Sequence, residues 1–159
     1  MLGLLKEVDI NAEAAISIAA GMRKMAMSDD EVHPSEVEMI EQFLNDVKGE
    51  VEANGGDVAS ISSEDVNLDA LSTDELKETF LLCLAMVALA DGTIRDEEVA
   101  LLQDYVDQMG FQQSGKQIID MVGQMMLSHF KGVSLFRSQA EDIGRALGLD
   151  EAAIAQALN

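Results

Sequence analysis

Apolar residues recur at intervals of three and four along most of the chain, the spacing that places them on one face of an α-helix. The clearest case begins at Pro34, a residue suited to a first helical position, and stops at Asn54. Its apolar positions are Val37, Ile40, Leu44, Val47 and Val51. The same spacing predicts a preceding helix over residues 11–28, with Asn11 as its cap.

Further helical patterns follow a polar, Gly- and Ser-containing stretch over residues 55–72, which we expect to be a surface loop with one short turn. A capping-box pattern at residues 72–75 predicts the start of a long helix that ends near Ala90 and is apolar on every side in its second half. Four further helices are predicted. The first covers residues 96–109, and the second carries Ile118, Val122, Met125 and Met126. The last two cover residues 135–147, with Phe136 on the apolar face, and residues 151–158.

No segment alternates between apolar and polar residues as a half-buried strand does. The chain has 159 residues, of which 48% are apolar, and its single proline and ten methionines favour helices packed through aliphatic side chains. We therefore expect an all-α fold, one compact domain over residues 1–159 built as a bundle of about six to eight helices.

The chain also shows a weak internal duplication of a helix-turn-helix unit. The stretch MAMSDDEVHPSEVEMIEQFLNDV aligns with VALADGTIRDEEVALLQDYVDQM without a gap. Asp29 and Asp91 are 62 residues apart, as are Glu36 and Glu98. Apolar helix faces resemble one another easily, so the acidic pair at identical spacing is the more informative part of the match.

The second acidic turn looks at first like half of an EF-hand, since Asp91, Gly92 and Glu98 match loop positions 5, 6 and 12. Positions 1 and 3 would then be Val87 and Leu89, whose side chains cannot bind calcium. The equivalent positions of the first turn are both methionine. Neither turn is an EF-hand, and any ion site must collect its other ligands elsewhere.

Two interpretations of the acidic residues remain open. In the first, Glu36 and Glu98 are the third residues of their helices and accept hydrogen bonds from the backbone N–H of the capping residues. This leaves Asp29 and Asp91 unexplained, because a carboxylate at the C-terminal end of a helix is unfavourable. A cation, or a local N–H donor within the turn, should compensate for these charges.

In the second interpretation the two turns pack together and Asp29, Glu36, Asp91 and Glu98 form a site for Ca²⁺ or Mg²⁺, which prefer carboxylate oxygens. A zinc site is disfavoured, because His33 has Arg95 at the equivalent position and no cysteine lies nearby. We expect His33 at the surface. His129, in an apolar stretch, is expected to be a half-buried packing residue.

The formal net charge of −20 disfavours nucleic acid and anionic membrane surfaces as partners and leaves cations or a basic protein. Direct membrane insertion is not expected, because the longest apolar run, residues 80–90, is too short to span a bilayer. Cys83 reads as a buried hydrophobe, and without a signal-peptide pattern the expected location is the cytoplasm. The oligomeric state is not predicted.

Catalytic motifs are lacking: the sequence has no nucleophile-elbow serine, no phosphate-binding glycine loop and no Cys-His arrangement that the pattern supports. We therefore expect no enzyme activity. The methionines suit either the core or a pliable peptide-binding groove, and their helical spacing favours the core.

The stretch ALADGTIRDEE, residues 88–98, resembles the signature of the TerB family of tellurite-resistance-associated helical domains. AMSDDEVHPSE, residues 26–36, fills the place of the first acidic turn of that family, and GLDEAAIAQAL, residues 148–158, is similar to its closing helix. One departure is Asp30, which stands where the family prefers glycine and leaves the geometry of the first turn open.

The resemblance implies an all-helical fold and divalent-metal binding by Asp29, Glu36, Asp91 and Glu98. It also implies a sensing or scaffolding role in a stress or tellurite-resistance response, without making tellurite a ligand. The alternative is a metal-free acidic module, of a protein-interaction or co-chaperone-like kind, in which the turns only connect helices.

Overall fold

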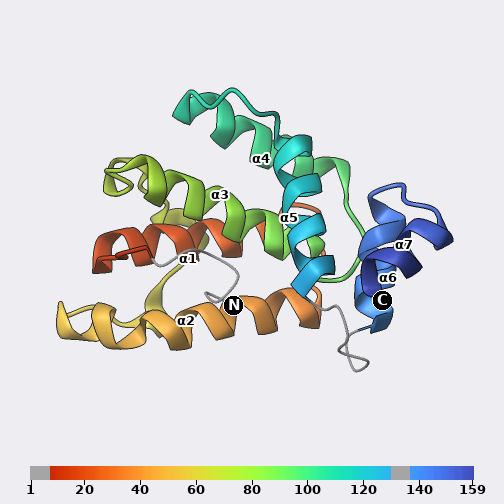
Figure 1. The fold of residues 1–159 in the computed structure, drawn as a ribbon. Coiled ribbons are helices and arrows are strands. Elements are labelled where there is room, and N and C mark those ends of the chain that lie inside the picture. Colours follow the sequence, from red (N-terminus) through yellow and green to blue (C-terminus); the bar gives the residue numbers. More distant parts are fainter. Residues whose placement is uncertain (1–7, 130–136) are drawn as a thin grey trace.

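The computed structural model describes residues 8–129 and 137–159, and these residues form a bundle of seven α-helices without a strand (Figure 1). The helices are α1 (Ala12–Ala26), α2 (Pro34–Ala53), α3 (Asp74–Leu89), α4 (Asp96–Met109), α5 (Gly115–His129), α6 (Arg137–Ala146) and α7 (Glu151–Leu158). The all-α prediction is confirmed. Leu135 and Phe136 of the predicted sixth helix lie outside the described residues, as does the side chain of His129.

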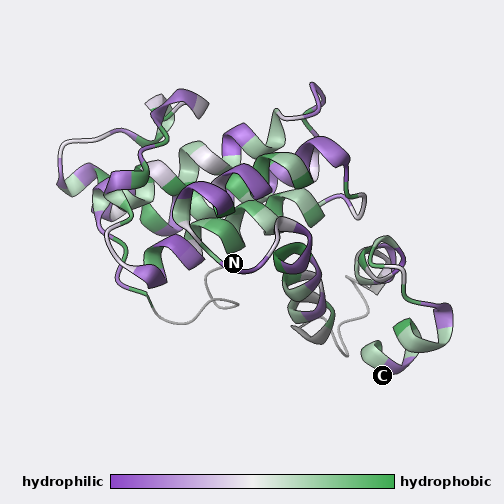
Figure 2. Cartoon of the chain, turned by 90° about the horizontal axis from the view of Figure 1, so that it is seen from above, coloured by the Kyte–Doolittle hydropathy of each residue, from purple (hydrophilic) through white to green (hydrophobic). Residues whose placement is uncertain are grey.

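The helices stack in the order α4, α3, α1 and α2, with α5 packed across α3 and α4 (Figure 1). α6 and α7 lie beside α5 at one end of the stack in both overall views. Each long helix carries both hydrophilic and hydrophobic positions (Figure 2), as amphipathic packing requires. No helix in the described part of the chain is both long and apolar enough to cross a membrane.

α3 occupies the centre of the core, as its apolar second half predicts. Phe80, Cys83 and Leu84 are fully buried in it, and burial raises the pKa of the Cys83 thiol to about 12. The Phe80 ring meets the ring of Tyr105 of α4 edge-on, at a centroid distance of 5.0 Å. Gly21 of α1 lets the helices approach closely, because a Cβ there would lie 2.5 Å from the Phe80 ring.

The start of α3 differs from the predicted capping box by one residue. Thr73, not Ser72, is the capping residue, and its hydroxyl accepts a hydrogen bond from the N–H of Leu76 at 3.2 Å. Both residues suit a cap, and the box spacing from Ser72 to Glu75 selected the wrong one. The helix itself starts within the expected range.

The stretch over residues 55–72 is more ordered than the surface loop predicted for it. It contains three 3-10 helices instead of one short turn: η2 (Val58–Ser60), η3 (Ser63–Asp65) and η4 (Leu68–Ala70). Ser17 of α1 anchors the segment, because its hydroxyl donates to the carbonyl of Asn67 at 2.8 Å and accepts from the Asn67 N–H at 3.0 Å.

Candidate functional site

Two short connections bring the predicted acidic residues together. The first corner, residues 27–33, joins α1 to α2, and the second corner, residues 90–95, joins α3 to α4. α1 packs against α3, and an ion pair between the side chains of Arg95 and Asp29 links the corners directly. The two turns therefore meet at one end of the bundle, as the metal-site interpretation requires.

In the first corner, Asp29 and Glu36 satisfy local backbone donors. The Oδ1 atom of Asp29 accepts the N–H of Glu31 at 3.0 Å, and Oε2 of Glu36 accepts the N–H of His33 at 2.8 Å. Asp30 between them is left-handed, with φ of 64°, which aspartate tolerates better than most residues. Asp30 thus adopts the left-handed conformation that Gly92 has at the equivalent position of the second corner.

The second corner repeats this hydrogen-bond pattern. The Oδ1 atom of Asp91 accepts the N–H of Thr93 at 3.0 Å, and Oε2 of Glu98 accepts the N–H of Arg95 at 2.9 Å. Gly92, with φ of 77°, occupies the left-handed position. The prediction that both glutamates reach back to the capping residue of their helix is confirmed.

Arg95 neutralises part of the charge that collects between the corners. Its Nε atom lies 2.7 Å from Oδ2 of Asp29, and its Nη2 atom lies 2.8 Å from Oδ2 of Asp91. Its Nη1 atom is 3.9 Å from Oε1 of Glu98. A planar guanidinium can bridge several carboxylates in this way because its donors point in fixed, divergent directions.

The two compensations expected for the aspartates are thus both present, namely a local N–H bond and a cation. The role of Arg95 was missed in the sequence, although a signal existed: Arg95 is the only Lys or Arg in either eleven-residue turn motif. Its side chain is 21% exposed, whereas those of Asp29 and Asp91 are 9% and 13% exposed. The shielding from water strengthens these ion pairs relative to surface pairs.

His33 belongs to the same cluster, which corrects its prediction as a surface residue. Its side chain is 29% exposed, and its Nε2 atom lies 2.9 Å from Nη2 of Arg95. Since the guanidinium has only donors, this contact fits a neutral imidazole whose Nε2 accepts. The same nitrogen is 3.5 Å from Oδ2 of Asp91. His33 thus extends the hydrogen-bonded network around Arg95.

Glu36 and Glu98 are the buried members of the cluster, each 1% exposed. Burial, together with the negative charges of Glu36 and Asp91, raises the pKa of Glu98 to about 7 against the opposing effects of the Arg95 N–H and guanidinium. Burial also raises the pKa of Glu36. Oε1 of Glu36 is buried without a hydrogen-bond partner, a costly arrangement for a carboxylate oxygen.

The four carboxylates have the donor chemistry of a Ca²⁺ or Mg²⁺ site, since all are hard oxygen ligands, and the unpaired Oε1 of Glu36 lacks a cation or donor. Their present arrangement does not form one. Within residues 8–129 and 137–159, no three or more His, Cys, Asp or Glu side chains are placed to hold a metal ion. The guanidinium of Arg95 lies between the carboxylates of Asp29 and Asp91.

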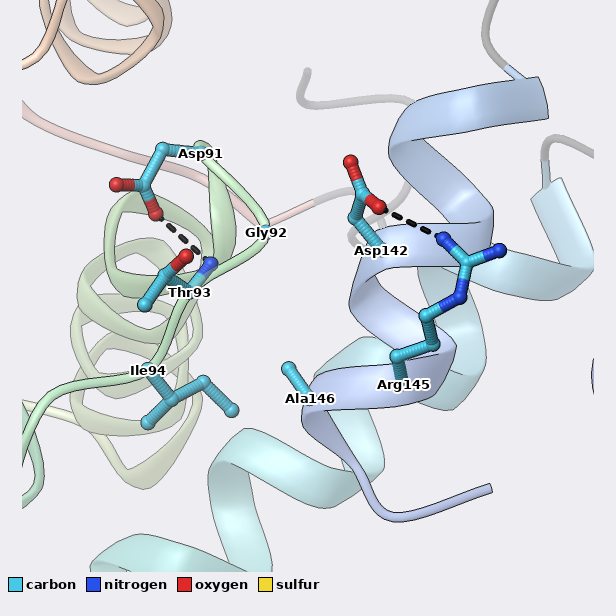
Figure 3. A pocket seen from close by; sticks show the side chains of 7 residues that line it. All are labelled: Asp91, Gly92, Thr93, Ile94, Asp142, Arg145 and Ala146. Carbon is cyan, nitrogen blue, oxygen red and sulfur yellow. Dashed lines mark hydrogen bonds and ion pairs between the residues drawn. The ribbon is translucent and has the colours of Figure 1, made fainter. Parts of the chain in front are cut away.

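α6 flanks the second corner from outside. Asp91, Gly92, Thr93 and Ile94 of the corner and Asp142, Arg145 and Ala146 of α6 line a cavity of about 510 Å³ (Figure 3). Asp142 is held by Arg145, whose Nη1 atom donates to Oδ1 of Asp142 at 2.9 Å. A Cβ on Gly92 would lie 2.7 Å from the Cβ of Asp142, so the turn and the helix are in close contact.

The family model described as tellurite resistance protein TerB matches residues 15–120 of the chain. The matched range contains both corners and the four predicted ligand residues. Residues 148–158, which resemble the closing helix of that family, lie beyond it. Searches of the curated proteins and of the solved structures return no match.

Proposed function

The chain belongs to the TerB family, and from this premise we propose that it is a non-enzymatic, cytoplasmic domain that binds a divalent cation between its two acidic corners. The response it serves is of the stress or tellurite-resistance type. The observation that carries the proposal is the convergence of three shielded carboxylates, those of Asp29, Asp91 and Glu98, on one guanidinium, while the buried carboxylate of Glu36 keeps one oxygen unpaired. A single guanidinium does not balance the charge of all four carboxylates when they are ionised.

Asp29, Glu36, Asp91 and Glu98 would hold the ion, with Ca²⁺ or Mg²⁺ preferred because every donor is a carboxylate oxygen. Binding requires the Arg95 side chain to move away from the two aspartates. The divalent ion, with twice the charge, then replaces the guanidinium between them. Bound ion would also neutralise Glu36 and Glu98, whose burial is unfavourable when they are ionised. The ion then acts as a structural link between the α1–α2 and α3–α4 units.

Calorimetric titration of chelator-treated protein with Ca²⁺, Mg²⁺ and Mn²⁺ tests the proposal. We expect the double variant Asp29→Asn, Asp91→Asn to weaken binding at least tenfold, because it removes two charged ligands and retains the size of both side chains. Saturation at a hundred times Kd should stabilise the wild-type fold by about 2.7 kcal/mol in a melt.

Asp57→Asn is the matched control. Oδ1 of Asp57 accepts the N–H of Ala59 at 3.0 Å in a turn like those of Asp29 and Asp91, and Asp57 lies at the start of η2, outside both corners. The control should bind as wild type does. If none of the three ions binds, or if the double variant and the control bind equally, the site is wrong.

A second function, a metal-free acidic interaction module, is favoured by one specific observation: Arg95 already bridges the corners, so the turns are held together without an ion. This function predicts that capture of a basic protein partner weakens with salt and does not respond to a chelator. Capture that a chelator abolishes supports the metal-dependent function instead.

A further inference from the structure

An apolar groove lies on the outer side of the first corner and α2. Its floor and walls are formed by Met27, Val32, Val37, Ile40, Leu44 and Ile61, and its volume is about 460 Å³. Met27, Val32 and Val37 are 55%, 53% and 39% exposed, which makes them three of the five large exposed hydrophobic residues in the described part of the chain. Such a concentration of exposed apolar side chains is typical of an interaction surface.

The residues at the equivalent positions of the second unit, 62 further along, are covered. Leu89 and Leu102, equivalent to Met27 and Ile40, are fully buried, and Val106, equivalent to Leu44, is 1% exposed. Ile94 and Val99, equivalent to Val32 and Val37, pack against the core. Ile40 and Leu44 are also buried, so the two units differ at three positions: Met27, Val32 and Val37 are exposed, whereas their equivalents are buried or partly buried.

The cover of the second unit consists of helices. α5 packs against α4, and the N–H of Gly115 at its start donates to Oε1 of Gln103 at 2.8 Å. Ala146 of α6 lines the same cavity as Ile94 (Figure 3). α2, at the opposite edge of the stack in Figure 1, packs against α1, α3 and η2, and among residues 8–129 and 137–159 no other α-helix covers its outer side.

The surroundings of the groove indicate the charge of an occupant. Glu41 lies in the groove wall, and the exposed side chains of Asp30, Glu31 and Glu38 lie on the same corner and helix. Arg23 is the cation in the wall, and its Nε atom is buried without a hydrogen-bond partner. The Arg23 side chain as a whole is partly exposed, and the N–H donors of its guanidinium suit an acceptor of a partner, such as a carbonyl at a helix C-terminus.

We propose that this groove binds an amphipathic helix of a basic partner protein. The helix places its apolar side on Met27, Val32 and Val37, as α5 and α6 do on the second unit of this chain, and its Lys and Arg residues face the acidic rim. The guanidinium of Arg23 donates a hydrogen bond to a carbonyl at the C-terminal end of the helix. The proposal does not depend on metal binding.

Fluorescence anisotropy with a labelled synthetic peptide tests the groove, with EDTA present so that the outcome is independent of any ion. The probe is an eighteen-residue helix with Leu at every third and fourth position and Lys elsewhere. We expect saturable binding that weakens as NaCl is raised. A peptide of the same composition with its apolar side scrambled should bind at least tenfold more weakly, and so should a version with Glu in place of Lys.

The double variant Met27→Gln, Val37→Thr should lower the affinity for the peptide about tenfold, since both changes remove apolar surface without altering charge. The control Met121→Gln, Met125→Gln changes two other exposed apolar residues, 47% and 36% exposed on α5, and should leave the affinity unchanged. Equal affinity of both double variants, or equal binding of the scrambled or acidic peptide, overturns the proposal.

Analytical sedimentation of the protein alone tests whether the groove binds a second copy of the chain. The proposal expects the same sedimentation coefficient for wild type and the groove variant. If wild type forms a dimer that the groove variant abolishes, the groove is occupied by a second copy of the chain and the proposal for a basic partner is wrong.

Discussion

The two corners have matching backbone geometry and different neighbours. Each contains an aspartate that accepts an N–H two residues on and a left-handed residue, and the helix that follows each corner supplies a glutamate that accepts the N–H of the residue before that helix. The second corner is flanked by α6, while the first is bordered by an open groove. Local sequence sets the turn, and the packing of later helices decides which turn is left accessible.

The largest effect is expected from placing the left-handed aspartate of the first corner into the second. Gly92→Asp adds a Cβ that would lie 2.7 Å from the Cβ of Asp142 at a φ of 77°, and it adds a charge beside Asp91. Backbone strain and overpacking together should lower the free energy of unfolding by about 3 kcal/mol. Urea denaturation measures this loss.

Gly110→Asp separates strain from packing. Gly110 has a similar φ of 74°, and no atom lies within 4 Å of a Cβ placed there. Its replacement should cost only the backbone strain, about 1 kcal/mol. Equal losses in the two variants would show that contact with α6 contributes nothing to the requirement for glycine at position 92.

The next largest loss of stability is expected from replacing Arg95, the residue that precedes α4. Arg95→Ala removes the cation shared by Asp29, Asp91 and Glu98, and we expect it to lower the free energy of unfolding by about 2 kcal/mol in low salt with EDTA. The estimate is below that for a fully buried pair because the Arg95 side chain is 21% exposed.

His33→Ala is the matched change in the first corner and should cost less than about 1 kcal/mol, since it removes a neutral hydrogen-bond partner. Denaturation of both variants with and without Ca²⁺ connects this test to the proposed function. If the ion takes the place of the guanidinium, Ca²⁺ should restore the free energy of unfolding that the Arg95→Ala variant has lost. Equal losses in the two variants would show that Arg95 does not act through its charge.

The third predicted effect is a dependence of the free energy of unfolding on pH. Burial raises the pKa of Glu98 from 4.5 to about 7, so the folded protein holds a proton that the unfolded chain releases at lower pH. The stability associated with this protonated carboxyl is present below about pH 4.5 and is lost as pH rises to about 7. The loss is confined to that window, because above about pH 7 both the folded and the unfolded protein have released the proton.

Glu98→Gln removes the titration and can keep the acceptor for the N–H of Arg95. We expect the variant to gain stability relative to wild type as pH increases from 4.5 to 7.5, in chemical denaturation with EDTA. Glu78→Gln, a change at an exposed position of α3, should follow the wild-type profile. A constant difference between Glu98→Gln and wild type across this range would exclude Glu98 as the titrating group.

The sequence predicted the features that depend only on neighbouring residues in the chain. The bounds of α4 and α7 and the backbone hydrogen bonds of Glu36 and Glu98 all follow from helical periodicity and capping within a few residues. Thr73 shows the limit of such rules, since adjacent Ser and Thr both fit a cap and only the folded chain distinguishes them.

The contacts between the corners lay beyond sequence pattern. Arg95 reaches Asp29 only because α1 packs against α3, a pairing that no local periodicity encodes. The partly buried position of His33 and the open groove beside Val32 have the same origin. The sequence supplied the four acids, while the tertiary fold determined that an arginine lies between two of them.

The smallest effect is the reverse exchange, Asp30→Gly, which gives the first corner the residue of the second. Glycine relieves the strain of a side chain at φ of 64° and removes a negative charge from an acidic corner, while it adds freedom to the unfolded chain. The net result should be a gain of about 0.5 kcal/mol in the free energy of unfolding, measured by urea denaturation.

Asp30→Asn, which removes the charge and keeps the side chain, should give the electrostatic part of that gain, and this part should vanish at high salt. A loss of stability in Asp30→Gly that Asp30→Asn does not show would mean that the added freedom of the unfolded chain outweighs the relieved strain, and the equivalence of the two left-handed residues would then be limited to their backbone.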